Sequence, residues 1–188
     1  IEFHTDSALV LGLRGFLNRI DDAIIDNAVS SVPSQSISVN AGKARSYGVA
    51  ATASQTLTRH LSWFANVTFT SSQVDNTLVP DQDGTEIPFV PDFVANAGLS
   101  IRLPLDIVAS PRLQIVGDYF DSTSQAGRKR FGSYEVLDMK LQRTWEMPAG
   151  YSISGSIDLN NLLDRRYEMP WQFQNPGFNA SIGIEVSF

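Results

Sequence analysis

Few residues of this chain could take part in bond-making chemistry. The two histidines, His4 and His60, fall at predicted short turns, and no serine or carboxylate is tied to either of them by its spacing. The chain has no cysteine, which excludes disulfides and thiolate metal sites. Neither a phosphate-binding glycine loop nor a metal-spaced histidine cluster is present. We therefore expect no catalytic residue, no metal site and no cofactor, and a small barrel enzyme acting on lipids is the weaker alternative.

One acidic segment superficially resembles part of a calcium-binding loop. Asp81, Asp83 and Glu86 surround Gly84. A complete loop of this kind needs further oxygen ligands at fixed positions and closes with a glutamate at its twelfth residue. These ligands are missing, so a solvated loop tip is the better interpretation.

Two other segments combine cations with aromatic rings, which could bind an anionic ligand through charge-assisted hydrogen bonds and stacking. The candidate ligand-binding residues are Arg128, Lys129, Arg130, Arg165, Arg166, Tyr167 and Trp171. Solvation, or contact with the phosphates of surrounding lipopolysaccharide, explains the same residues and is the interpretation that we favour.

The overall charge argues against nucleic acid as a partner. The chain carries a net charge of -6 and has an isoelectric point near 4.8. Domains that bind nucleic acid gather lysine and arginine on one face. The only basic cluster, Arg128 to Arg130, is too short for that role.

The elements that hold these residues alternate between apolar and polar positions. Near the end of the chain Ala180, Ile182, Ile184, Val186 and Phe188 are apolar, and the residues between them are small or polar. This period of two predicts a β-strand with one apolar face. We count eight such strands, at 9–17, 47–57, 61–70, 93–103, 113–119, 137–145, 151–159 and 179–188. No run approaches the roughly 18 apolar residues of a membrane-spanning helix.

Connection lengths distinguish a membrane barrel from a soluble sheet, which could show the same alternation. Short and long connections alternate strictly along the chain. The short ones are 4–7, 58–60, 104–111 and 146–150, and the long ones are 21–44, 71–92, 121–132 and 164–177. Tight periplasmic turns and long external loops are typical of outer-membrane barrels. We therefore predict an all-β fold, an antiparallel transmembrane β-barrel.

Aromatic residues near the ends of the strands support this interpretation, because amphipathic rings favour the lipid interface. Ordinary core aromatics are the alternative for any single ring. We expect Trp63, Trp145, Tyr151 and Phe188 in a periplasmic girdle, and Phe69, Phe93 and Tyr119 in an external one.

Charged residues occupy the polar positions of several strands. They are Arg102, Arg112, Asp118, Asp138, Lys140, Asp158 and Glu185. A charge that points into hydrocarbon would cost roughly 2 to 4 kcal/mol at the midplane. We therefore expect these side chains to face water, a plug or one another. Arg143 is the one charge on the apolar side of its strand.

The end of the chain resembles TonB-dependent receptors. The segment 160–167, Asn-Asn-Leu-Leu-Asp-Arg-Arg-Tyr, precedes Pro170, the turn at 175–177 (Asn-Pro-Gly) and a strand closing on Phe188. That family typically ends in an Asn-Leu-hydrophobic-Asp segment with a following Tyr, a Pro-Gly turn and a last strand with a terminal aromatic. In place of the arginine that commonly follows the turn, this chain has Phe178, so any role of that arginine is not transferable.

Two internal segments also resemble the family. Residues 16–24 resemble a strand leading into a long outer loop, and residues 87–91 resemble the return into the next strand. The resemblance implies a barrel of about 22 strands around a plugged lumen. Residues 1–188 would be its C-terminal segment, with Ile1 to Phe3 as the tail of an incoming strand and the plug upstream. The alternative is a complete small barrel of eight strands with a structural or adhesion role.

The resemblance also implies energy-coupled uptake of a scarce nutrient. An iron chelate such as a siderophore is the expected substrate, ahead of cobalamin and oligosaccharides. The implied partners are TonB, reached through the upstream plug, and the barrel-assembly machinery, together with outer-membrane lipid and lipopolysaccharide. An insertion signal for that machinery is expected at Ser181, Gly183, Val186 and Phe188, which match the polar-x-Gly-x-x-apolar-x-apolar ending of this class.

Overall fold

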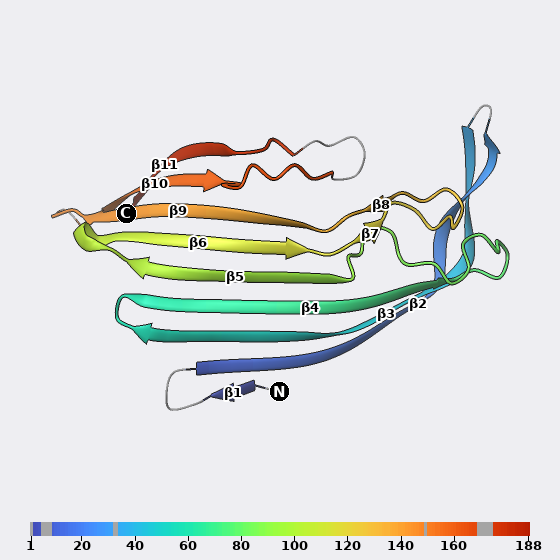
Figure 1. Ribbon diagram of the computed structural model, residues 1–188, viewed down its shortest axis with the longest axis horizontal. Helices are drawn as coiled ribbons and strands as arrows, with labels where there is room; N and C mark the ends of the chain where they lie inside the picture. Colours follow the sequence, from blue (N-terminus) through green and yellow to red (C-terminus); the bar gives the residue numbers. More distant parts are fainter. Residues whose placement is uncertain (1, 5–8, 32–33, 149, 169–174) are drawn as a thin grey trace.

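The chain folds into one antiparallel sheet in which strands that follow one another in the sequence lie side by side (Figure 1). A computed structural model describes residues 2–4, 9–31, 34–148, 150–168 and 175–188, with side chains from residue 9 onward except 22–41. Nine strands form the sheet, in the order β1-β2-β3-β4-β5-β6-β9-β10-β11. They are β1 (Glu2–His4), β2 (Leu9–Ser31), β3 (Ser34–Thr58), β4 (Leu61–Asp75), β5 (Phe93–Arg102), β6 (Ile107–Val116), β9 (Tyr134–Glu146), β10 (Ser152–Asn160) and β11 (Asn179–Ser187).

Three smaller elements lie between these strands. A 3-10 helix, η1 (Pro104–Asp106), joins β5 to β6. The strands β7 (Tyr119–Phe120) and β8 (Arg130–Phe131) pair with each other in a separate two-stranded sheet. In the part of the chain that the structure describes, no helix is long and apolar enough to cross a membrane.

The prediction of an all-β antiparallel fold is confirmed, with the eight predicted strands and the incoming tail at Glu2–His4. Residues that lie opposite each other on neighbouring strands show why the alternation creates two different faces. One row of paired residues contains Leu11, Ala53, Ala65, Ala97, Leu113 and Leu137. The row next to it contains Gly12, Thr52, Asn66, Asn96, Gln114 and Val136. Because adjacent side chains point to opposite sides of a strand, the first kind of row builds an apolar face and the second a polar face.

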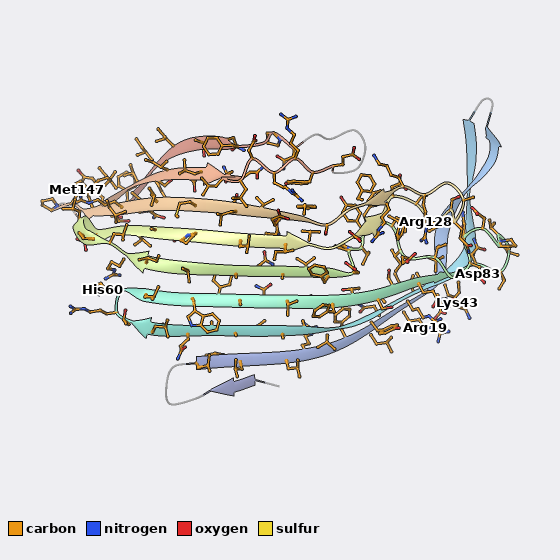
Figure 2. The ribbon with its side chains drawn as sticks, viewed as in Figure 1. Arg19, Lys43, His60, Asp83, Arg128 and Met147 are labelled. Atoms are coloured by element: carbon orange, nitrogen blue, oxygen red, sulfur yellow. The ribbon has the colours of Figure 1, made fainter. Side chains whose placement is uncertain are left out.

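The short and long connections segregate to opposite ends of the sheet, as predicted. Figure 1 shows the turns between β3 and β4, β5 and β6, and β9 and β10 at one end, and the long connections at the other. In Figure 2, His60 and Met147 lie at the short-turn end, whereas Arg19, Lys43, Asp83 and Arg128 lie at the long-loop end.

The expected long loop at 21–44 is wrong. β2 and β3 continue as a paired hairpin as far as Ser31 and Ser34, and the hairpin bends away from the rest of the sheet (Figure 1). Register shifts lie between Ile20 and Ala23, between Ala23 and Ile24, and between Ala28 and Ser30. Bulges of this kind bend a strand and increase its twist.

The expected short turn at 104–111 is also too long. Only Leu103 and η1 separate the strands, and Leu105 and Asp106 adopt positive φ angles of 65° and 56° there. β6 starts at Ile107 and includes Pro111, which pairs with Met139 of β9. A proline cannot donate a ladder hydrogen bond, which is why it suggested a turn rather than a strand.

Most of the expected girdle residues lie near the predicted strand ends. The Phe69 and Phe93 ring centroids are 6.1 Å apart near the long-loop end, and those of Tyr151 and Phe188 are 6.3 Å apart near the short-turn end. The prediction for Tyr119 is wrong, because this ring is buried against Phe131. Its strand in the main sheet stops at Val116, so the outward alternation does not extend to Tyr119.

Candidate functional site: the loop assembly

Three connections meet at the long-loop end of the sheet. They are loop A (residues 76–92, between β4 and β5), loop B (117–133, between β6 and β9) and loop C (161–178, between β10 and β11, described to 168 and from 175). We refer to them together as the loop assembly. Hydrogen bonds and ion pairs join them.

Loop A is folded around the fully buried side chain of Asn76. The Asn76 side-chain oxygen accepts hydrogen bonds from the amides of Leu78 (3.1 Å) and Val79 (3.3 Å), which closes a tight turn. The Asn76 Nδ2 donates to Gln82 Oε1 at 2.8 Å, and its backbone amide donates to Asp83 Oδ1 at 2.9 Å. These bonds fix the segment that carries the acidic residues.

Each carboxylate of this acidic segment has a partner in the protein. Asp83 Oδ1 accepts from the Asn76 amide, and Asp81 Oδ1 accepts from the Ala126 amide at 3.1 Å. Glu86 pairs with Arg128. Among the described residues, no three His, Cys, Asp or Glu side chains gather closely enough to hold a metal ion. Asp81 and Asp83 are exposed, as a solvated tip requires, and Asp81 and Glu86 also join loop A to loop B.

Loops A and B are joined along their length. The backbone amide and the side-chain Nε2 of Gln125 donate to the carbonyls of Asp81 and Asp83, each at 2.8 Å. The Arg128 guanidinium pairs with Glu86 and stacks 3.8 Å from the centroid of the Phe120 ring. Arg128 thus combines an ion pair with a cation–π contact and is mostly shielded from water.

Loop C joins the same assembly. Lys129 pairs with Glu168, and the Tyr119 hydroxyl donates to the Glu168 carbonyl at 3.4 Å. Arg130 pairs with Asp118 inside loop B. Two stacked ring pairs lie here: Tyr119 on Phe131, with centroids 5.1 Å apart, and Tyr134 on Tyr167, at 3.9 Å.

The hydroxyls of this aromatic group stay protonated. Burial, and then the neighbouring Tyr167, raises the pKa of Tyr119 above its usual value of 10. Burial, and then the charge of Asp138, raises the pKa of Tyr167. Both phenols therefore remain neutral hydrogen-bond donors at physiological pH.

Asn161 organises the start of loop C. It is buried, with a positive φ of 53°, and its amide donates to Asp138 Oδ1 at 2.8 Å. Its side chain donates to the Arg165 carbonyl (3.0 Å) and accepts from the Arg165 amide (2.9 Å). Asp164 Oδ1 accepts from the Phe178 amide at 2.9 Å, which links the two ends of the loop. The Asn-Leu-Leu-Asp segment thus has a local structural function.

The predicted ligand-binding residues fall into distinct groups. Arg128, Lys129 and Arg130 are paired as above, and Arg165 lies 3.4 Å from Glu135. Arg166 is exposed and has no hydrogen bond or ion pair with any described residue. Trp171 lies outside the described residues. The sequence analysis missed the carboxylate partners, because Arg128 and Glu86 are 42 residues apart and no local pattern connects them.

The predicted insertion-signal residues lie far from the loop assembly, in and just beyond β11. Ser181, Gly183 and Val186 are opposite Asp158, Ser156 and Ile153 of β10. Phe188 is fully exposed. Among the described aromatic rings, only that of Tyr151 lies near it, with the two centroids 6.3 Å apart.

The polar face of the sheet carries a second network. Asn96 Oδ1 accepts from Arg112 (3.1 Å) and Gln114 (3.4 Å), and Asn96 Nδ2 donates to Asn66 at 3.1 Å. Lys140 lies 3.9 Å from Asp158. Of the expected interior charges, Arg112, Lys140 and Asp158 therefore have partners on neighbouring strands, beside a groove of about 780 Å³.

Comparison with known proteins agrees with this architecture. The family model for the TonB dependent receptor-like β-barrel matches residues 1–162. No curated protein sequence matches the chain. Of the solved structures, the chain is similar to the ferric yersiniabactin uptake receptor FyuA from Yersinia pestis (22% identity, TM-score 0.67, 98% of this chain and 28% of that one).

Two further solved structures have the same fold. The ferric preacinetobactin receptor BauA from Acinetobacter baumannii is 12% identical, with a TM-score of 0.73, over 97% of this chain and 28% of that one. The copper transporter OprC is 18% identical, with a TM-score of 0.71, over 100% of this chain and 30% of that one. The chain therefore spans less than a third of the length of these structures.

The two-faced sheet, its segregated loops and the family match lead to one assignment. The family comprises receptors and transporters of the bacterial outer membrane rather than enzymes. The chain belongs to the TonB-dependent receptor-like β-barrel family, and its place is in the outer membrane.

Proposed function

We propose that this chain forms part of the barrel wall and external loops of a receptor that imports a scarce nutrient in an energy-coupled way. The observation that carries the proposal is the contrast between the two faces of the sheet. The polar face holds a hydrogen-bonded row through Asn66 and Asn96 and the Lys140–Asp158 pair, and the apolar face carries exposed side chains such as Ile157. Such a wall suits lipid on one side and a polar, plugged lumen on the other.

An iron chelate such as a siderophore is the substrate class that we propose. FyuA and BauA are named as receptors for ferric chelates, although OprC is named as a copper transporter. Cationic and aromatic groups in the loop assembly would complement an anionic chelate.

The candidate contact residues differ in whether a protein carboxylate already pairs with their charge. Arg166 is exposed and pairs with no carboxylate among the described residues, so its charge is the most open to a ligand. Arg128, Lys129, Arg130 and Arg165 would first have to exchange a protein carboxylate for the ligand anion. Tyr167 could present the edge of its stacked ring, and Trp171 belongs to the same loop. We therefore propose Arg166 as the leading contact.

We further propose that residues 1–188 are the C-terminal segment of a larger barrel with a separate plug. In the described part of the sheet, β1 pairs only with β2, and β11 pairs only with β10. Unpaired backbone groups at a sheet edge are costly in lipid, so both edges need further strands. The alternative of a self-contained barrel would require β1 and β11 to pair with each other. TonB would act through the plug, and the assembly machinery would recognise the end of β11.

Uptake of a labelled ferric siderophore by cells producing the full-length receptor tests the function. We expect uptake that stops when TonB is removed or the inner membrane is de-energised. Receptor-dependent uptake that persists without energy coupling would contradict the proposal.

Binding of the transported chelate tests the contact residue separately. Arg166→Ala should weaken binding about tenfold, the effect of losing one hydrogen bond to a charged group. Arg19→Ala removes an exposed cation at the same end of the sheet and should leave binding unchanged (Figure 2). Equal binding by both variants would exclude Arg166 without affecting the transport proposal.

A further inference from the structure

Arg143 is a cation in an apolar setting. It lies on β9 directly between Ile107 of β6 and Gly155 of β10, so it belongs to the apolar face of the sheet. Its Nε atom is buried and has no hydrogen-bond partner, which is the only such case among the described side chains. Its guanidinium lies 5.2 Å from the centroid of the Trp145 ring. A buried donor of a charged group without an acceptor is unfavourable, so the site lacks a complementary anion.

A groove of about 410 Å³ adjoins this side chain. Its walls are almost entirely apolar and include Ile107, Leu141, Trp145, Ile157, Ile182 and Ile184. Ile182 and Ile184 lie opposite Ile157 and Gly155 of β10, so the groove runs along the apolar face of β11. Its shape and lining suit a hydrocarbon chain.

The depth of Arg143 agrees with a headgroup position. Arg143 is three residues from the end of β9 at Glu146, on the side of the short turns. With a rise of about 3.4 Å per residue and a tilt of about 45°, this corresponds to roughly 7 Å below the strand end. Trp145, two residues nearer the turn, lies where aromatic belts meet the headgroups. The guanidinium therefore lies just inside the periplasmic interface.

We propose that this groove binds one phospholipid of the periplasmic leaflet, with its phosphate on the Arg143 guanidinium and an acyl chain along Ile182 and Ile184. The guanidinium fork matches a phosphate in geometry and charge. The Trp145 ring, packed over Gly155, would form the wall of the headgroup site. This site lies on the outer surface of the barrel and is separate from any path through the lumen.

Lipid binding can be measured on the full-length receptor by native mass spectrometry in a neutral detergent with added phosphatidylglycerol. We expect one tightly held lipid on the wild type, and about tenfold weaker retention for Arg143→Gln, which loses the charge-assisted contact. Arg143→Lys should be intermediate, because an ammonium keeps the charge but lacks the fork. Arg19→Gln removes an exposed cation at the opposite, long-loop end of the sheet and should behave as the wild type (Figure 2).

Diacylglycerol, which has the same acyl chains without the phosphate, controls for the fold of the groove. It should bind weakly and equally to the wild type and Arg143→Gln. Equal retention of phosphatidylglycerol by these two proteins would overturn the proposal. So would equal retention of both lipids by the wild type, because the groove would then recognise hydrocarbon only.

Discussion

Asn161 shows how a single side chain directs a whole connection. It is buried at a positive φ of 53° and makes three hydrogen bonds to Asp138 and Arg165. Asparagine tolerates the left-handed region better than most residues, because its short side chain bonds locally. The resemblance to TonB-dependent receptors predicted where this segment lies in the chain. Its hydrogen bonds were not predictable, since they depend on how β9 and β10 lie together.

Phe188 is the residue for which the sequence makes the sharpest prediction. It is fully exposed, beyond the end of β11, two positions after Val186 on the apolar face. If it belongs to an insertion signal, its deletion from the full-length receptor should lower the inserted fraction several-fold and leave unfolded protein in the periplasm. Phe188→Tyr should be tolerated, because an aromatic ring remains at the interface, whereas Phe188→Asp should not.

Surface protease protection of whole cells measures the inserted fraction. If Phe188 only ends a hydrophobic strand, deletion should cost at most roughly 1.5 to 3 kcal/mol of stability and leave insertion normal. Normal insertion of the deletion variant would therefore exclude the signal.

At the level of elements, alternation predicted the transmembrane strands well because lipid imposes one apolar face on each of them. The β2–β3 hairpin beyond Ile20 escaped prediction because its pairing depends on the backbone ladder and its sequence contains many serines. The start of β6 was not predicted because the strand contains Pro111, and a strand interior rarely contains proline. The contacts between loops A and B were invisible, as they join residues more than 40 positions apart.

Arg128 makes one of these contacts between loops. Its side chain is only 21% exposed, and it joins Glu86 of loop A to Phe120 of loop B. Arg128→Ala should weaken the closed loop assembly by roughly 1 kcal/mol, after allowance for the half-exposed glutamate. Protease cleavage of the loops on intact cells should then be roughly fivefold faster.

Arg130→Ala is the matched control, because Arg130 pairs with Asp118 within loop B alone and is 66% exposed. Its cleavage rate should stay near that of the wild type. Equal acceleration in both variants would mean that Arg128 does not join the two loops.

For the whole molecule, the decisive property is the difference between the two faces of one continuous sheet. Apolar rows such as Leu113–Leu137 and polar rows such as Asn66–Asn96 run across neighbouring strands of the sheet. The alternation of each strand could be read from the sequence, and pairing without crossovers brings the rows into line. Membership of the receptor family then assigns lipid to the apolar face and the lumen to the polar one.

Spin labels along β10 of the full-length receptor in a bilayer test this assignment most directly. The 188 residues contain no cysteine, so single substitutions can be labelled cleanly within this segment. Labels at Ile153→Cys and Ile157→Cys should be accessible to oxygen, which concentrates in lipid, and inaccessible to a water-soluble nickel complex. Labels at Ser154→Cys and Ser156→Cys should lack the high oxygen accessibility. Equal accessibility at all four positions, or the reverse phase, would contradict the account.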